Sequence, residues 1–89
     1  MSGFMHSWIT AKLQADFSPS FLDVIDESAD HAGHNAQARD SGETHFRVRM
    51  VTPAFAGLSR VEQHRRVNAS LAEALKGSVH ALALEVSAA

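Results

Sequence analysis

The clearest pattern in the chain is an alternation of apolar and basic side chains over residues 45–50. A period of two places successive side chains on opposite faces of a β-strand. The apolar set is Phe46, Val48 and Met50, and the basic set is His45, Arg47 and Arg49. Pro53 cannot donate to a strand ladder, so we expect the strand to end near Thr52. A short connection through Phe55 and Gly57 should follow.

A helical pattern begins after this connection. Ser59 and Glu62 have the spacing of a capping box, in which each side chain bonds to the backbone of the other. Residues at three- and four-residue intervals then share one side: Val61, His64, Val67, Asn68, Leu71, Ala74 and Leu75. Lys76 and Gly77 are typical of a helix end. The pattern predicts one helix from Ser59 to Lys76, with His64 as a neutral, hydrogen-bonded imidazole on its apolar side.

Three further elements are predicted outside this region. Residues 6–16 form a short amphipathic helix, in which His6 receives no role, and the Ser-Pro-Ser sequence at 18–20 ends it. Strands follow at residues 21–27 and 79–86. Their inward sides carry Leu22 and Val24 in the first, and His80, Leu82, Leu84 and Val86 in the second.

These elements predict a single α/β domain over residues 1–89, a two-layer fold of order helix, strand, strand, helix, strand. A helical connection between the last two strands makes them parallel, whereas the first two, joined by a loop, are antiparallel. We expect a three-stranded mixed sheet with both helices on one face. The predicted core is Trp8, Ile9, Leu13, Leu22, Val24, Phe46, Val48, Met50, Val61, Val67, Leu71, Leu75, Leu82 and Leu84.

Composition narrows the class of protein. The chain has 89 residues, 45% of them hydrophobic, which is enough for one core. It has no cysteine, so it can supply no disulfide or thiolate ligand. No apolar run approaches the ~18 residues of a membrane span. We therefore expect a soluble cytoplasmic domain. Residues 28–42 lack large apolar side chains and are predicted to be a mobile loop.

Histidines gather at one end of the predicted sheet. Parallel strands place His80 at the same end as His45, where the loop carrying His31 and His34 rejoins the sheet. Histidines in this arrangement are either solvated polar side chains or metal ligands, and their spacing alone does not decide between the two.

The charge is distributed unevenly along the chain. Its net charge is -2, but residues 1–43 hold two basic and seven acidic side chains, and residues 44–89 hold six basic and three acidic. Acidic overall charge disfavours non-specific nucleic-acid binding, which depends on phosphate neutralisation. A local basic patch remains available in Arg47, Arg49, Arg60, Arg65 and Arg66. The alternative is charge pairing, of the strand arginines with Asp23 and Glu27 and of Arg66 with Glu62.

Four short motifs occur in a fixed order: Glu43-Thr44-His45-Phe46-Arg47-Val48, Phe55-x-Gly57-x-Ser59, His64-Arg65 and Val79-His80-Ala81-Leu82-Ala83-Leu84. Together they resemble the BolA family, and the resemblance extends from Ile9 to Leu84. It implies a fold like that of a class II KH domain. The chain lacks the GxxG loop with which KH domains hold nucleotides.

The resemblance also implies a cofactor and a partner. BolA-like proteins share a [2Fe-2S] cluster with a monothiol glutaredoxin and glutathione. Their ligands correspond to His80 and, on the loop, to His31, with His34 as a close competitor. Imidazole can replace thiolate on one iron of such a cluster. Because this chain has no cysteine, the thiolates would come from the partner and glutathione.

Family members are also described as DNA-binding transcriptional regulators. This chain departs from the family at Gln63 and at Asn68-Ala69-Ser70, and it lacks the C-terminal T-P-x-x-W extension; the first two departures weaken DNA binding more than cluster binding. Catalysis by Ser28, Asp30 and His31 is disfavoured, because neighbours in a mobile loop lack the required orientation. We therefore expect a non-enzymatic adaptor for a glutaredoxin, with DNA-binding regulation as the alternative.

Overall fold

The computed structural model describes residues 4–27, 45–77 and 79–88. Its elements are α1 (Phe4–Phe17), β1 (Phe21–Asp26), β2 (His45–Val51), the 3₁₀ helix η1 (Pro53–Phe55), α4 (Arg60–Ser70), α5 (Ala72–Lys76) and β3 (Ala81–Ser87). The predicted order of helices and strands is confirmed, except that the second helix is divided into α4 and α5. No helix within these ranges has the length and apolar character needed to cross a membrane.

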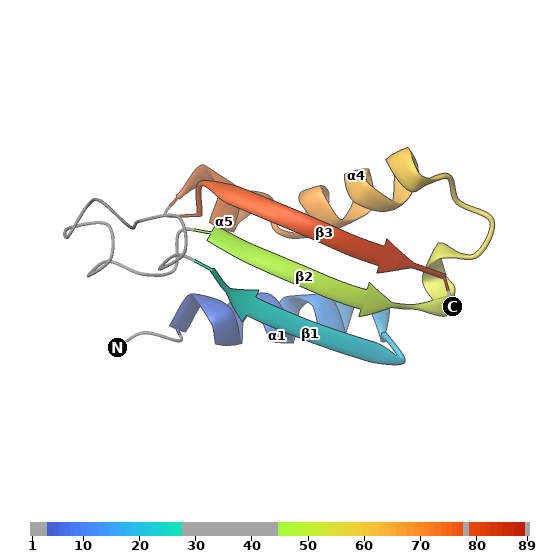
Figure 1. Cartoon of the computed structure of the whole chain (residues 1–89), viewed down its shortest axis with the longest axis horizontal. Helices are drawn as coiled ribbons and strands as arrows, with labels where there is room; N and C mark the ends of the chain where they lie inside the picture. Colours follow the sequence, from blue (N-terminus) through green and yellow to red (C-terminus); the bar gives the residue numbers. More distant parts are fainter. Residues whose placement is uncertain (1–3, 28–44, 78, 89) are drawn as a thin grey trace.

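The sheet has the predicted topology. Its strand order is β1-β2-β3, so β2 is central and the other two strands form the edges. β1 pairs antiparallel with β2, with Val24 opposite Val48, and β2 pairs parallel with β3, with Val48 opposite Leu84. Figure 1 shows the helices together behind the sheet. The opposite face, which we call the open face, carries none of the described helices.

The core lies between the helices and the inward side of the sheet. Phe46, Val48 and Met50 of β2 are at most 1% exposed, whereas Arg49 between them is exposed. The alternation predicted for this strand is therefore confirmed. The other predicted core residues that are buried are Ile9, Leu13, Val24, Val67 and Leu71. Five more are partly buried and pack against this cluster: Trp8, Leu22, Leu75, Leu82 and Leu84.

The second helix differs from the prediction in two respects. Leu71 has φ -101° and ψ 17°, which ends α4 there, although its amide still bonds to the Val67 carbonyl oxygen at 3.0 Å. Val61 was predicted to be buried but is 59% exposed. Val61 lies in the first turn of α4. The core contacts of this helix are made farther along the chain, by Val67 and Leu71.

The connections before α4 and after α5 contribute core residues that periodicity did not indicate. Phe55 of η1 is completely buried and meets Phe17 of α1 in an edge-to-face contact, with ring centres 5.2 Å apart. Thr52 is also buried; its hydroxyl donates to the Phe17 carbonyl oxygen at 2.6 Å and accepts from the Ala54 amide. Val79, which precedes β3, is 2% exposed, and its amide bonds to the Ala74 carbonyl oxygen.

Candidate functional site

Two histidines lie together where β2 and β3 begin. β2 starts at His45, which is opposite Ala81 in the parallel register, so His80 immediately precedes β3 beside it. The two imidazole ring centres are 6.4 Å apart, and the rings are inclined at 47°. His80 is exposed and His45 is half-buried. The prediction that the parallel strands bring these two side chains to one end of the sheet is confirmed.

The other predicted ligands belong to the segment between β1 and β2. His31 and His34, and the whole predicted loop over residues 28–42, lie outside the described residues. β1 ends at Asp26, and the described chain stops one residue later at Glu27 and resumes at His45. The Glu27 amide bonds to the His45 carbonyl oxygen at 2.8 Å. Glu27 and His45, the described residues on either side of that segment, therefore lie at the end of the sheet where His80 lies.

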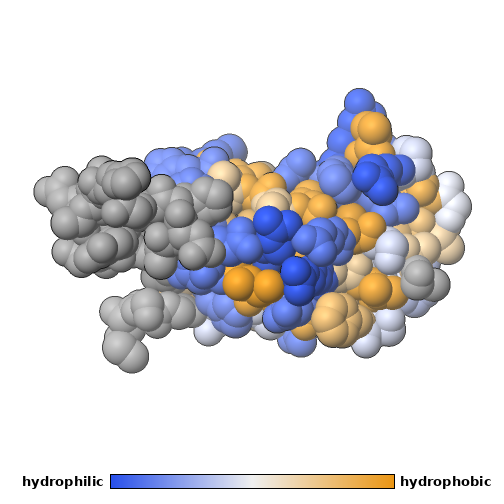
Figure 2. All heavy atoms as spheres, in the orientation of Figure 1, coloured by the Kyte–Doolittle hydropathy of each residue, from blue (hydrophilic) through white to orange (hydrophobic). Residues whose placement is uncertain are grey.

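The two strand arginines are engaged in ion pairs on the open face. Arg47 Nε lies 2.8 Å from a Glu27 carboxylate oxygen, and its Nη1 lies 2.7 Å from Glu85. Arg49 Nε lies 3.2 Å from the other Glu85 oxygen. The hydrogen bonds that Arg47 donates to Glu27 and then to Glu85 raise the pKa of Arg47 above its ordinary value. Figure 2 shows a hydrophilic cluster near the middle of this face.

Charge pairing is therefore the role that the structure gives to Arg47 and Arg49, although one expected partner differs. Asp23 lies opposite Arg49 in the β1–β2 register but has no ion pair with it among the described residues. Glu85, opposite Arg49 on the other side in β3, takes that place. The Glu85 carboxylate thus pairs with both arginines, through one oxygen with Arg47 and through the other with Arg49.

Two of the three helix arginines lie near one carboxylate. Arg66 Nε is 3.3 Å from a Glu62 oxygen, as predicted from the four-residue spacing, and Arg65 is 3.9 Å from the other. The Arg65 and Arg66 side chains are 74% and 52% exposed. Exposed ion pairs of this kind are weak. Because both guanidinium groups are also exposed, they stay accessible to an anion.

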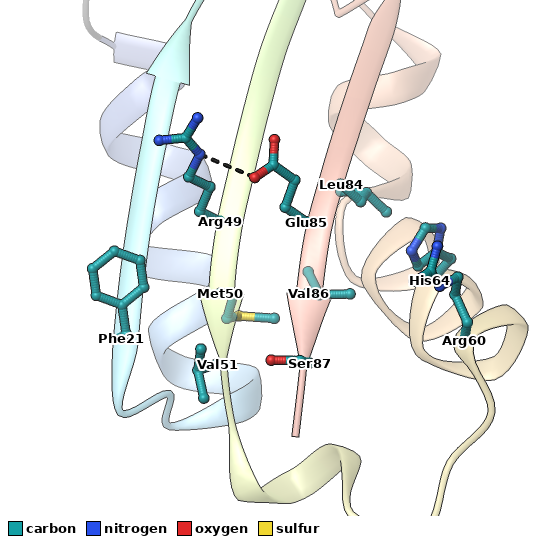
Figure 3. Close-up of a pocket in the computed structure, with 10 residues that line it drawn as sticks. All are labelled: Phe21, Arg49, Met50, Val51, Arg60, His64, Leu84, Glu85, Val86 and Ser87. Carbon is teal, nitrogen blue, oxygen red and sulfur yellow. Dashed lines mark hydrogen bonds and ion pairs between the residues drawn. The ribbon is translucent and has the colours of Figure 1, made fainter. Parts of the chain in front are cut away.

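Arg60 is in a different environment, which the sequence did not indicate. It lies beside His64 on α4, at a groove of about 400 Å³ that also contains Leu84 and Val86 of β3 (Figure 3). Within the described residues Arg60 has no ion pair. The His64 ring has no hydrogen bond among the described residues either, so the prediction of an imidazole bonded to backbone or side chain is wrong. The sequence feature that could have indicated this site is the four-residue spacing of Arg60 and His64, which puts both residues on one side of the helix.

Comparison with known proteins gives consistent relatives. The chain is 45% identical over 76 residues to the DNA-binding transcriptional regulator BolA of Escherichia coli, covering 85% of this chain and 68% of that protein. It is 43% identical over 83 residues to human BolA-like protein 1, covering 93% of this chain and 57% of the human protein. The chain thus spans little more than half the length of that relative.

Solved structures agree with the sequence relatives. The BolA domain of SufE1 from Arabidopsis thaliana superposes with a TM-score of 0.86 at 38% identity, covering 99% of this chain and 95% of that one. The profile of the family described as BolA-like protein matches residues 13–89. From its fold, its relatives and this match, the chain belongs to the BolA-like protein family.

Proposed function

We propose that this chain is a non-enzymatic adaptor that binds a monothiol glutaredoxin and shares a [2Fe-2S] cluster with it and with glutathione. Its role would be in iron-sulfur cluster trafficking or iron-responsive regulation. The observation that carries the proposal is the exposed His80 imidazole at the start of β3, 6.4 Å from the ring of His45.

The donor chemistry at this end of the sheet fits a shared cluster. A neutral imidazole offers one nitrogen lone pair to a metal, and the strand that follows His80 fixes its backbone. The chain contains six histidines and no cysteine, so it can supply nitrogen but no thiolate. His80 would be one ligand and His31 the second, with His34 as the competitor. Bound there, the cluster would supply one-electron chemistry, tuned by nitrogen ligation of one iron.

The test is a titration with a monothiol glutaredoxin that carries a glutathione-ligated [2Fe-2S] cluster. The wild-type chain should form a one-to-one complex and change the visible absorption and circular dichroism of the cluster, because nitrogen replaces sulfur on one iron. His80→Ala should abolish that change. His31→Ala should weaken it more than His34→Ala.

Asn68→Ala removes an exposed polar side chain from α4 and serves as the control; it should match the wild type. Backbone circular dichroism of each variant verifies the fold. Identical cluster spectra for the wild type and His80→Ala would contradict the assignment of His80.

A second candidate function is DNA-binding regulation. It is supported by the name of the Escherichia coli relative and by the accessible guanidinium groups of Arg65 and Arg66. Arg47 and Arg49 support it less, because their charges are matched by Glu27 and Glu85. Any DNA surface on this chain is therefore expected on α4 rather than on the sheet, with Arg60 at its edge.

The salt dependence of binding to a double-stranded DNA fragment tests this candidate. Each phosphate contact contributes about 0.9 to the slope of log K against log salt, so Arg65→Ala with Arg66→Ala should reduce the slope by about two. Lys12→Ala with Lys76→Ala removes the same charge elsewhere and should leave the slope within about half a unit of the wild type. An unchanged slope in the arginine double variant would exclude α4 from the interface.

A further inference from the structure

The outer edge of β3 has backbone groups available for pairing. β3 is an edge strand of the described sheet. The Thr52 amide donates to the Ser87 carbonyl oxygen at 3.0 Å, so the polar groups of Ser87 point towards the β2 side. Backbone groups of successive residues in a strand point to opposite sides. Those of Leu84 and Val86 therefore point away from β2, where no hydrogen bond within the described chain engages them.

Basic side chains stand beside this edge. Arg60 and His64 are one turn apart on α4, and Figure 3 shows them next to Leu84 and Val86 on the helix side of β3. Among the described arginines, Arg60 alone lacks a carboxylate partner. The His64 ring can donate a hydrogen bond in either protonation state. The groove, which is also lined by the Glu85 carboxylate that pairs with Arg49, therefore combines an unpaired strand edge with an unmatched cation.

We propose that this groove binds an extended acidic peptide segment of a partner protein, which adds to the sheet as a fourth strand along β3. The unpaired backbone of Leu84 and Val86 would supply main-chain hydrogen bonds, which is how strand addition gains affinity. A carboxylate on the peptide would meet Arg60 and His64, and the charge-assisted bond would set its register. This site lies at the opposite end of β3 from His80 and does not depend on cluster binding.

Charge and backbone geometry favour a peptide over nucleic acid as the occupant. Outward N–H and C=O groups in alternation match another strand, whereas a phosphate chain would use only the donors. The other arginine at this groove, Arg49, is already paired with Glu85, so Arg60 is the one unmatched guanidinium among the described residues there. A single unmatched guanidinium beside an open strand edge suits an isolated carboxylate better than a row of phosphates.

The test uses the isotope-labelled full chain and a terminally blocked heptapeptide of alternating valine and glutamate. Binding should change the NMR shifts of the Leu84 and Val86 amides and slow their hydrogen exchange. Arg60→Gln should weaken binding about tenfold, the effect of one hydrogen bond to a charged group. Lys76→Gln removes an exposed cation from α5 and should bind as the wild type does. A peptide in which glutamine replaces glutamate should bind the wild type more weakly than the glutamate peptide does, by the same factor. Arg60→Gln should bind the two peptides equally well.

Peptide backbone methylation separates strand addition from simple charge attraction. In an extended peptide the valine amides point to one edge and the glutamate amides to the other. N-methylation of one set should abolish binding, and methylation of the other set should be tolerated. Tolerance of both sets, or no binding at all, would overturn the proposal.

Two other occupants would also overturn it. Binding of a thymidine heptanucleotide at the groove without binding of the peptide would identify a nucleic-acid site. Shifts of Leu84 and Val86 that depend on protein concentration alone would identify pairing between two copies of the chain. Retained peptide binding by Arg60→Gln, with the fold confirmed by its spectrum, would exclude the carboxylate contact.

Discussion

Single polar residues attach α1 to the sheet and to α4. His6 Nε2 lies 2.6 Å from the Val24 carbonyl oxygen, and because that oxygen can only accept, Nε2 is the protonated nitrogen. At the other end of α1, Asp16 accepts hydrogen bonds from the Ser70 hydroxyl and from Lys12. The sequence pattern gave His6 no role, because a contact across 18 residues leaves no periodic signal.

The Asp16 contacts predict a dependence of stability on pH. The Ser70 hydrogen bond, and then Lys12, hold the pKa of Asp16 below its ordinary value of 3.8. The folded state therefore binds fewer protons than the unfolded state near that pH. The stabilisation is fully present above the ordinary pKa and is lost as the pH falls through the lowered folded value.

Urea unfolding at about pH 6 and at about pH 3 measures this effect. The wild type should lose stability between the two pH values, and Ser70→Ala should lose less, because its Asp16 pKa is closer to the ordinary value. Gln14→Ala, a change at an exposed position of α1, should show the wild-type difference. An equal loss in Ser70→Ala would mean that the hydrogen bond has no effect on the titration.

At the scale of elements, α4 shows how far periodicity can place a helix face. The pattern correctly located Val67 and Leu71 in the core but also included Val61. An apolar residue in the first turn fits the same stripe whether or not the helix end reaches the sheet. The direction of the helix axis decides this, and it is set by tertiary packing rather than by spacing.

This difference can be measured with two matched substitutions on one helix. Val67→Ala should lower the free energy of unfolding by about 2 kcal/mol, from two lost methyl groups and the cavity that they leave. Val61→Ala should change it by less than about 0.5 kcal/mol, because the side chain is exposed and alanine has the higher helix propensity. Denaturant unfolding followed by circular dichroism compares them. Equal losses would show that Val61 is buried in solution.

At the scale of the whole molecule, the order of elements and the strand directions could be predicted because each strand carries its own alternation and a helical crossover permits one arrangement. Phe55 could not be predicted as core, since it follows Pro53 in a three-residue 3₁₀ helix with no repeat to indicate a face. The pairing of His45 with His80 followed from the strand directions. The groove at Arg60 could not be predicted in this way, because its position depends on which edge of the sheet α4 leaves uncovered.

The parallel pairing of β2 and β3 has a consequence for simultaneous binding. His80 precedes β3, and the groove residues Leu84 and Val86 follow it by four and six residues, so they lie roughly 13 and 20 Å away at 3.3 Å per residue. A ligand at His80 and an extended peptide along the edge of β3 would therefore contact different residues of the chain. Coupling between them could pass only through β3 and its packing, so their coupling free energy should be close to zero. On the two proposals above, one BolA-like chain of 89 residues would carry two separate binding sites joined by a single strand.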